Sequence, residues 1–307
     1  MDPTPLVSVV LPCYNGAEFI ADAIDSVRAQ TYPAVELIVV DDGSTDASGE
    51  IAAAHHEVTL LRQPRGGLSA ARNAGWRTAR GDLIVFLDAD DRLLPTALAV
   101  GSAALKEHSL CAFVYGRYRL IGRDGKPMPP VAARTVTEQH YIAMLRSNYI
   151  GMHAAVMYRR SILEELGGFR VALPRCEDYD MYLRVLRRYP AFGHTTTVAE
   201  YRQHGGNMSR DDAAMLKSAL AVLRFQRDFI VSDEERAACR DGALGWQDYY
   251  GRRLSRALAR HVSGREWMAA VRDAWCLLWY APSTLASTAT GIARARVARS
   301  ISTRTSR

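Results

Sequence analysis

Residues 83–91 read Leu83-Ile84-Val85-Phe86-Leu87-Asp88-Ala89-Asp90-Asp91, five apolar residues followed by three carboxylates within four positions. A short apolar run of this kind is typical of a strand buried on both faces, as in a parallel sheet. Similar runs occur earlier in the chain, at Val7–Leu11 and Glu36–Val40. Because helical patterns separate the three runs, the sequence predicts an α/β fold with a parallel sheet and right-handed crossovers.

Polar residues follow each of the three predicted strands. They begin after Leu11, after Val40 and after Leu87. The carboxyl ends of parallel strands meet at one edge of the sheet, and ligands bind outside that edge. We therefore expect a binding site there.

The carboxylates of residues 88–91 are the strongest local feature. Three like charges at a strand end repel one another, and a hard divalent cation would remove the conflict. Magnesium or manganese commonly takes one or two carboxylates together with phosphate oxygens of a substrate. The alternative is a solvated, aspartate-rich turn.

Two further clusters suggest nucleotide contacts. In Asp41-Asp42-Gly43-Ser44, the Asp42 carboxylate can accept a hydrogen bond from the nucleobase or the ribose of a nucleotide. The alternative is that this cluster forms the turn and the N-cap of the next helix. Arg72 stands one turn into the predicted helix Leu68–Ala79. Its guanidinium suits a bidentate contact with a phosphate or a nucleobase, and the alternative is an arginine on the surface without a ligand. No Gly-x-Gly-x-x-Gly and no P-loop follows the first strand, which disfavours a dinucleotide fold and a nucleotide hydrolase.

Two candidate residues lie later in the chain. Asp178, in Glu177-Asp178-Tyr179-Asp180 at the start of a predicted helix, is either a general base for a hydroxyl nucleophile or part of a helix cap. His204 precedes a Gly pair and is either a ligand of a metal or diphosphate, or a structural histidine.

The pattern of apolar residues changes near residue 210. Up to that point, shorter patterns predict strands and helices. Long helical patterns follow it. We therefore divide the chain into residues 1–210 and a helical region of residues 211–307. The expected elements are strands Cys111–Tyr115, Ala154–Tyr158 and Val198–Tyr201 and helices Thr137–Arg146, Tyr179–Tyr189, Asp212–Ile230, Asp233–Val262 and Arg265–Tyr280.

Charge is unevenly distributed. The chain has 39 basic and 33 acidic residues, a formal net charge of +6. The excess lies entirely after residue 210, and residues 293–307 contribute five arginines and no acid. A nucleic-acid binder would present a basic stripe on a folded face, so we do not expect DNA or RNA as a partner.

Four motifs, in order and spacing, resemble the family 2 glycosyltransferases. They are Val7-Ser8-Val9-Val10-Leu11-Pro12-Cys13-Tyr14-Asn15, Asp41-Asp42-Gly43-Ser44-Thr45-Asp46, Gly67-Leu68-Ser69-Ala70-Ala71-Arg72-Asn73-Ala74-Gly75 and Phe86-Leu87-Asp88-Ala89-Asp90-Asp91. Residues 177–180 resemble that family's acceptor-side acidic motif, and residues 201–204 resemble its closing segment. The resemblance covers residues 5–210.

The resemblance implies a GT-A fold, with a mostly parallel, Rossmann-like sheet flanked by helices, here followed by a C-terminal helical extension. It implies an inverting transferase with a nucleotide-sugar donor, of which a UDP-sugar is our expectation, and a divalent metal, Mn²⁺ or Mg²⁺. Carried over by position, Asp178 is the catalytic base, and Asp90 and His204 lie at the metal and diphosphate. The residues implied on the donor side are Pro12, Tyr14, Glu18, Asp42, Arg72 and Asp88.

Two other functions compete with this interpretation. A nucleotidyltransferase also combines such a sheet with metal carboxylates, but Cys13–Ala17 offers no lysine for the loop it would need. A non-catalytic sugar-nucleotide binding or scaffold module would not need Asp90 and Asp178.

We expect an acceptor that is a saccharide or lipid-linked, as in surface polysaccharide or glycolipid synthesis. The sequence does not give the sugar, the linkage or the oligomeric state.

The C-terminal region suggests two alternatives. Trp267, Trp275, Trp279 and Tyr280 concentrate aromatic surface, and the arginine-rich tail suits anionic lipid headgroups. The region therefore either contacts a membrane peripherally or packs on the rest of the chain or in a dimer. A spanning helix in the uncharged stretch Ala274–Ile292 is disfavoured by Pro282.

The location expected from the sequence is cytoplasmic, with the inner face of the membrane as the alternative. Five cysteines without a Cys-x-x-Cys pair favour a reducing compartment with free thiols, and the N-terminus has no secretory signal pattern.

Overall fold

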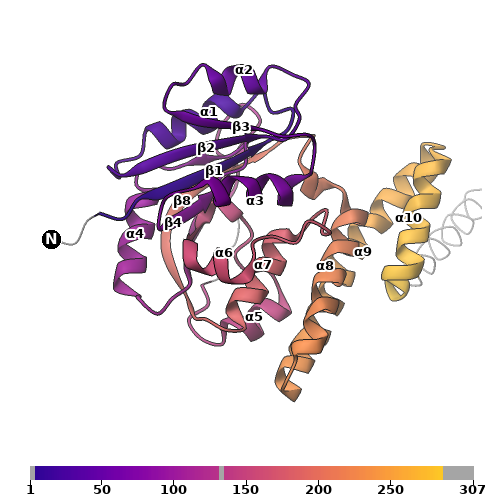
Figure 1. Cartoon of the computed structure of the whole chain (residues 1–307). Coiled ribbons are helices and arrows are strands. Elements are labelled where there is room, and N and C mark those ends of the chain that lie inside the picture. The colour runs from indigo at the N-terminus through magenta and orange to yellow at the C-terminus, as the bar shows by residue number, and fades with distance from the viewer. Residues whose placement is uncertain (1–3, 131–134, 286–307) are drawn as a thin grey trace, which may run out of the picture. The chain divides into compact units, whose positions relative to one another are not determined.

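The computed structural model of the chain describes residues 4–130 and 135–285 (Figure 1). They form two compact units: residues up to 144 together with 148–207, and residues 145–147 together with those from 208 onward. That these units are separate domains, as the division at residue 210 supposes, stays a proposal. The five arginines of residues 293–307 lie outside the described residues.

The first unit alternates strands and helices along the chain, as expected. Its elements are β1 (Val7–Cys13), α1 (Ile20–Arg28), β2 (Val35–Asp41), α2 (Ser48–Ala53), β3 (Val58–Arg62), α3 (Leu68–Thr78), β4 (Leu83–Phe86), β5 (Arg92–Leu93), α4 (Ala97–Glu107), β6 (Phe113–Gly122), α5 (His140–Arg146), β7 (Val156–Arg159), α6 (Arg160–Leu166), α7 (Glu177–Leu186) and β8 (Ala191–Gln203).

The strands form one sheet in the order β3-β2-β1-β4-β7-β6-β8-β5. The first four strands along this order are mutually parallel, as the apolar runs predict. Beyond them the sheet is mixed, because β7 is antiparallel to both neighbours, β6 and β8 are parallel, and β5 is antiparallel to β8. The α/β class is confirmed, with more antiparallel pairing than a Rossmann-like sheet has.

Helices cover both faces of the parallel strands. Ile20 and Ile24 of α1 and Leu98 of α4 pack into one core cluster with Val9 and Leu11 of β1. On the other face, α3 approaches β1 so closely that a Cβ on Gly75 would lie 2.3 Å from Val10 Cγ1. Glycine at this position therefore lets α3 rest on the sheet.

The strand ends place the polar clusters as predicted. In the parallel register Cys13 of β1 lies opposite Asp41 of β2, and Val10 lies opposite Phe86 of β4. The segments after these three strands therefore leave the same edge of the sheet.

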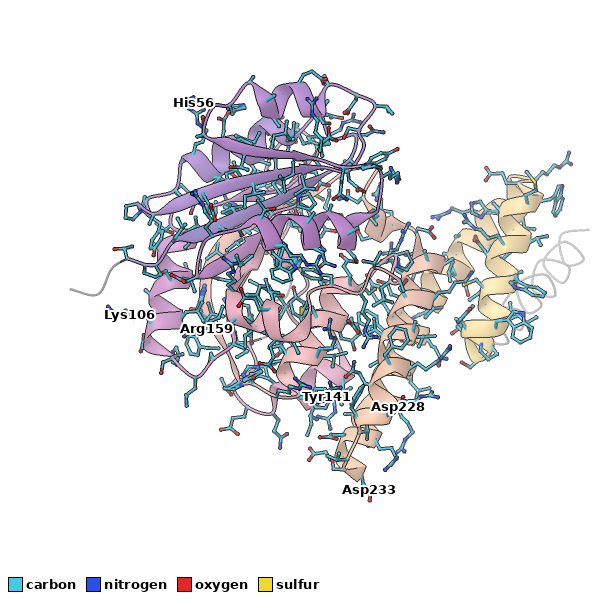
Figure 2. All side chains as sticks on the ribbon, in the orientation of Figure 1. His56, Lys106, Tyr141, Arg159, Asp228 and Asp233 are labelled. Atoms are coloured by element: carbon cyan, nitrogen blue, oxygen red, sulfur yellow. The ribbon has the colours of Figure 1, made fainter. Side chains whose placement is uncertain are left out.

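The antiparallel part of the sheet is held by long-range side-chain bonds. Arg159, labelled in Figure 2, donates from Nε to the Cys111 carbonyl at 2.9 Å and from Nη2 to the Leu105 carbonyl at 2.6 Å. These bonds tie the end of β7 to the C-terminal turn of α4. Strands β6 and β8 extend well beyond the residues predicted for them, because their outer halves pair with each other without forming apolar runs.

The second unit contains three long helices, α8 (Asp212–Gln226), α9 (Asp233–Ser263) and α10 (Trp267–Tyr280), close to their predicted bounds. Ser232 and Glu235 form a capping box at the start of α9, beside Asp233, which is labelled in Figure 2. Leu216, Leu254 and Leu277 share one core cluster of the three helices. Among the described residues, no helix has both the length and the apolar character to cross a membrane.

Candidate active site

Arg72 of α3 lies between two carboxylates at the predicted edge of the sheet. Its Nη2 donates to Asp88 Oδ1 at 2.6 Å, and its Nη1 donates to Glu177 Oε1. The side chain is only 1% exposed. Burial by itself lowers the pKa of a guanidinium, but the neighbouring carboxylates outweigh it and raise the pKa of Arg72. Arg72 is therefore a fixed cation that joins the end of β4 to the start of α7.

Asp178 follows Glu177 at the start of α7 and is partly exposed. Its Oδ1 accepts from the Tyr179 backbone N–H at 2.7 Å. Burial, and then the charge of Glu177, raise the pKa of Asp178 to about 7, although Arg72 lowers it. A carboxyl with a pKa near 7 exchanges protons at neutral pH, which is what general base catalysis requires.

Helix α7 is anchored beneath Asp178 by its neighbours. Tyr179 is buried and donates from its hydroxyl to the Met144 carbonyl at 2.9 Å. Asp180 is fully buried, with Arg170 at 3.2 Å and Arg184 at 3.5 Å. These contacts fix the first turn of the helix, so Glu177 and Asp178 lie on a rigid backbone.

The side chains of Asp90 and His204 are in contact, although the two residues are 114 positions apart in the sequence. Their Oδ2 and Nε2 atoms are 2.9 Å apart. The His204 ring packs on Phe19, with 4.8 Å between ring centroids. Burial and the nearby Asp88 raise the pKa of Asp90, against the hydrogen bond with His204. The structure thus brings together the two residues that the sequence analysis assigned to the metal and diphosphate.

These donors fit a divalent cation. A carboxylate oxygen and an imidazole nitrogen both suit Mn²⁺, and Asp88 adds a further carboxylate at the same strand end. Among residues 4–130 and 135–285 no three His, Cys, Asp or Glu side chains converge as a complete metal-binding group. A magnesium or manganese ion that completes its shell with substrate phosphate oxygens needs only one or two protein carboxylates.

Arg202 bonds the aspartate cluster; the sequence analysis had quoted it within residues 201–204 but left it without a role. It is 2% exposed, and its backbone N–H donates to Asp91 Oδ1 at 2.9 Å. Its Nε donates to the Asp90 carbonyl at 2.8 Å, and Nη2 donates to Asp22 Oδ2 at 2.8 Å. The residue therefore holds the backbone of the aspartate cluster against β8. No pattern in the sequence shows that Arg202 is buried.

Glu177 is the second residue that the sequence analysis left without a role. It stands inside the quoted motif of residues 177–180, so its neighbourhood was identified, but its pairing with Arg72 was not. Two residues 105 positions apart can be paired only once the strand order is known.

Asp42 makes its hydrogen bonds within the protein. Its Oδ1 accepts from Gln63 Nε2 at 2.7 Å and from the Gly66 N–H at 2.8 Å, and its Oδ2 accepts from the Gly67 N–H at 2.8 Å. The carboxylate is thus bonded to the turn that opens α3, and not to the start of α2. Its predicted contact with a base or ribose stays a prediction.

The other donor-side residues lie around the ends of β1 and α1. Pro12 is buried within β1. The exposed Tyr14 ring has the Arg65 guanidinium 3.3 Å from its centroid. Glu18 forms a two-pronged pair with Arg123, with distances of 2.6 and 2.7 Å. Their roles toward a nucleotide stay predictions.

His153 lies in the short 3₁₀ helix His153–Ala155, just before β7. It is buried, stacks on Phe86 at 5.0 Å between centroids, and its Nε2 is 3.1 Å from the Tyr158 hydroxyl. Burial, and then the charge of Arg72, lower the pKa of His153 well below the ordinary value and so favour its neutral ring.

The chain is similar to solved structures along most of its length. It matches residues 1–349 of TarS from S. aureus in complex with UDP-GlcNAc, with a TM-score of 0.62 and 16% identity, over 93% of this chain and 92% of that one. It also matches the mannosyltransferase PcManGT of Pyrobaculum calidifontis in complex with GDP-Man and Mn²⁺, with a TM-score of 0.62 and 20% identity, over 96% and 81%. These likenesses confirm the GT-A fold.

Sequence relatives agree with the motifs. TuaG of Bacillus subtilis, a glycosyltransferase assigned to teichuronic acid biosynthesis, is 30% identical over 72% of this chain and 88% of its own length. An uncharacterized glycosyltransferase of Rickettsia felis is 30% identical over 67% of this chain, but the match spans only 35% of that longer protein. The family model for glycosyl transferase family 2 matches residues 8–167. The chain therefore belongs to glycosyltransferase family 2, as its motifs predicted.

Proposed function

We propose that this chain transfers a sugar from a nucleotide-sugar donor to an acceptor hydroxyl, with inversion at the anomeric carbon. The observation that carries the proposal is the partly exposed Asp178, with its pKa raised to about 7, next to the Arg72–Glu177 ion pair. A carboxyl that exchanges protons near neutral pH beside the donor-side aspartates supports a transferase over a module that only binds.

Asp178 acts as the general base. Its carboxylate accepts the proton of the acceptor hydroxyl while the hydroxyl oxygen forms a bond to the anomeric carbon. The bond between that carbon and the diphosphate oxygen breaks on the opposite face, and the leaving diphosphate keeps the electron pair. Base and leaving group on opposite faces give inversion.

Arg72 acts by holding carboxylates in place. Both of its Nη atoms are engaged, by Asp88 toward the donor side and by Glu177 beside the base. It therefore fixes the distance between the two sides of the reaction, and a preorganised charge of this kind costs no rearrangement during the reaction. A direct contact between Arg72 and the nucleotide stays part of the proposal.

Asp90 and His204 would hold the divalent metal, with Asp88 beside them. When bound, the ion supplies positive charge that stabilises the leaving diphosphate. Without the ion, His204 Nε2 and Asp90 Oδ2 hydrogen-bond to each other and Arg202 bonds the Asp90 carbonyl, so the two side chains lie side by side; metal binding would replace the hydrogen bond between them.

The substrates are inferred from the relatives. The neighbours in fold were solved with UDP-GlcNAc and GDP-Man, so a UDP-sugar is our first candidate and a GDP-sugar the second. The relation to TuaG supports a saccharide or lipid-linked acceptor, as in the synthesis of a surface polysaccharide.

Screening tests the proposal. The purified chain is incubated with UDP- and GDP-sugars and Mn²⁺, and release of the nucleoside diphosphate is measured. We expect release from at least one donor, loss of release with EDTA, and its restoration by Mn²⁺. Donor binding without release, under all these conditions and with acceptor saccharides present, would identify a non-catalytic binding module instead.

A further inference from the structure

Helix α10 carries apolar side chains on its exposed face as well as on its packed face. The packed face is formed by Ala270, Cys276 and Leu277, each no more than 5% exposed. On the other side, six apolar residues are 53–91% exposed, and we call them the tryptophan face: Trp267, Met268, Val271, Trp275, Leu278 and Trp279. A helix with apolar residues on two faces is normally covered on both of them.

The tryptophan face is a continuous stripe. At 100° per residue its members fall within an arc of about 120°, and Trp275 and Trp279 lie one turn apart. The centroids of their rings are 5.7 Å apart. The sequence analysis included Tyr280 in this surface, but Tyr280 is partly buried. Contiguous exposed apolar surface of this kind marks a site of interaction.

The flank of the stripe is basic. From residue 249 to residue 285 the chain has six arginines and two acids, and one of the acids, Asp273, is fully buried and pairs with both His261 and Arg272 at 2.9 Å. Arg256 and Arg260 are exposed on α9, and Arg265 is exposed on the turn before α10. The sequence beyond residue 285 adds five arginines and no acid.

We propose that the tryptophan face binds the interface of a bilayer that contains anionic lipid. Tryptophan favours the level of the headgroups, where its ring is buried and its N–H stays wet. Arginines beside the stripe are attracted to anionic headgroups. A helix of 14 residues is about 21 Å long and suits an orientation parallel to the membrane surface. The proposal goes beyond the proposed function and does not depend on it.

A second copy of the chain fits the same surface less well. A symmetric pair would bring the tryptophan face and its flanking arginines against their own equivalents, so that like charges would meet at the rim. An anionic lipid surface complements both the stripe and its flank.

Flotation with vesicles tests the proposal on the full chain. We expect binding to vesicles of phosphatidylcholine with phosphatidylglycerol, weaker binding to phosphatidylcholine alone, and quenching of tryptophan fluorescence by brominated lipid. Replacing Trp267, Trp275 and Trp279 by Ser should weaken the partition at least about tenfold, because each ring loses its apolar burial. Far-ultraviolet circular dichroism shows whether the variant is folded.

A matched control uses three other exposed apolar residues of the same unit, Phe229, Val231 and Leu244, which are 44–87% exposed. Their replacement by Ser should leave lipid binding within about twofold, since surface changes away from an interface have small effects. A second arm replaces Arg256, Arg260 and Arg265 by Gln, and this variant should lose the preference for anionic vesicles.

Three outcomes would overturn the proposal. The first is a full chain that does not float with either vesicle. The second is a folded tryptophan variant that floats like the unchanged chain. The third is a dimer in light scattering that the tryptophan variant abolishes while lipid binding is absent, which would assign the face to a second copy. Flotation of Asp178→Asn, which is expected to be unchanged, separates this test from any failure of the proposed catalysis.

Discussion

Arg72 and Glu177 form a buried ion pair between α3 and α7, although 105 positions of sequence separate them. Neither charge has much access to water, since their side chains are 1% and 7% exposed. The pair joins α3, the helix that follows the third strand, to α7, the helix that carries the proposed base Asp178. The same two residues therefore hold α3 against α7 and lie beside Asp178 in the candidate active site.

Replacing Arg72 by Gln is expected to destabilise the chain by about 3–5 kcal/mol, because it leaves Glu177 buried without its partner. Denaturant unfolding monitored by circular dichroism measures this. The double variant Arg72→Gln/Glu177→Gln should recover part of the loss, since no charge is then left buried. Arg77→Gln, on the exposed side of the same helix, is the control and should change stability by no more than about 0.5 kcal/mol. Equal effects of Arg72→Gln and Arg77→Gln would contradict the structural role of the pair.

Asp178→Asn should lower the rate of transfer by about 10²–10⁴-fold while donor affinity is retained, because only the proton acceptor is lost. Turnover and donor binding are measured separately, by product formation and by calorimetry. Asp233→Asn, at a fully exposed position of α9, is the control and should behave like the unchanged chain. Transfer by the Asp178 variant at nearly the original rate would show that another group is the base.

Activity should rise with pH through the pKa of Asp178. A base acts only when it is deprotonated, and the pKa of this carboxyl is raised to about 7, so kcat/KM should fall below pH 7 and level off above it. A profile that stays flat from pH 5 to 8 would exclude Asp178 as the titrating group.

The same raised pKa predicts the sign of a stability effect. The folded chain holds the proton of Asp178 more tightly than the unfolded chain, so ionising this group destabilises the fold as pH rises from about 4 to 7. Asp178→Asn should therefore become more stable relative to the original chain over that range. Unfolding curves at pH 5 and pH 8 measure the difference, and a gain at pH 5 that vanishes at pH 8 would contradict the prediction.

His204→Asn should raise the Mn²⁺ concentration needed for half-maximal activity by about tenfold or more, since it removes a nitrogen donor beside Asp90. Asp90→Ala should abolish turnover at any metal concentration. Titration of donor hydrolysis with Mn²⁺ after EDTA treatment gives both results. An Asp90→Ala chain that hydrolyses donor without metal would remove Asp90 from the metal site.

Two glycines offer a matched test of packing. Gly75→Ala should destabilise the chain by about 1–3 kcal/mol, because the new Cβ would meet Val10 Cγ1 at 2.3 Å. Gly245→Ala, within α9, has nothing within 4 Å of the added Cβ and should stabilise the chain by about 0.5–1 kcal/mol. Both are read from denaturant unfolding. A neutral Gly75→Ala would mean that α3 does not rest on β1 as closely as described.

Much of the fold was predictable because it is encoded locally. The apolar runs that became β1, β2 and β4 are buried on both faces, so their composition alone distinguishes them from strands with a solvated face. The short strand β5 and the outer halves of β6 and β8 lack such runs, and their pairing partners are distant in the sequence. No local pattern could place them.

The sequence by itself determined the strand–helix alternation, the edge of the sheet at which the polar clusters gather, and the family to which the chain belongs. Only the tertiary structure decided that Arg72 is buried against Glu177, that Asp90 meets His204, and that Arg202 lies beneath the aspartate cluster. The physical reason is that strand and helix periods are properties of neighbouring residues. The pairing of buried charges depends on the order of strands in the sheet, which brings together segments more than 100 residues apart.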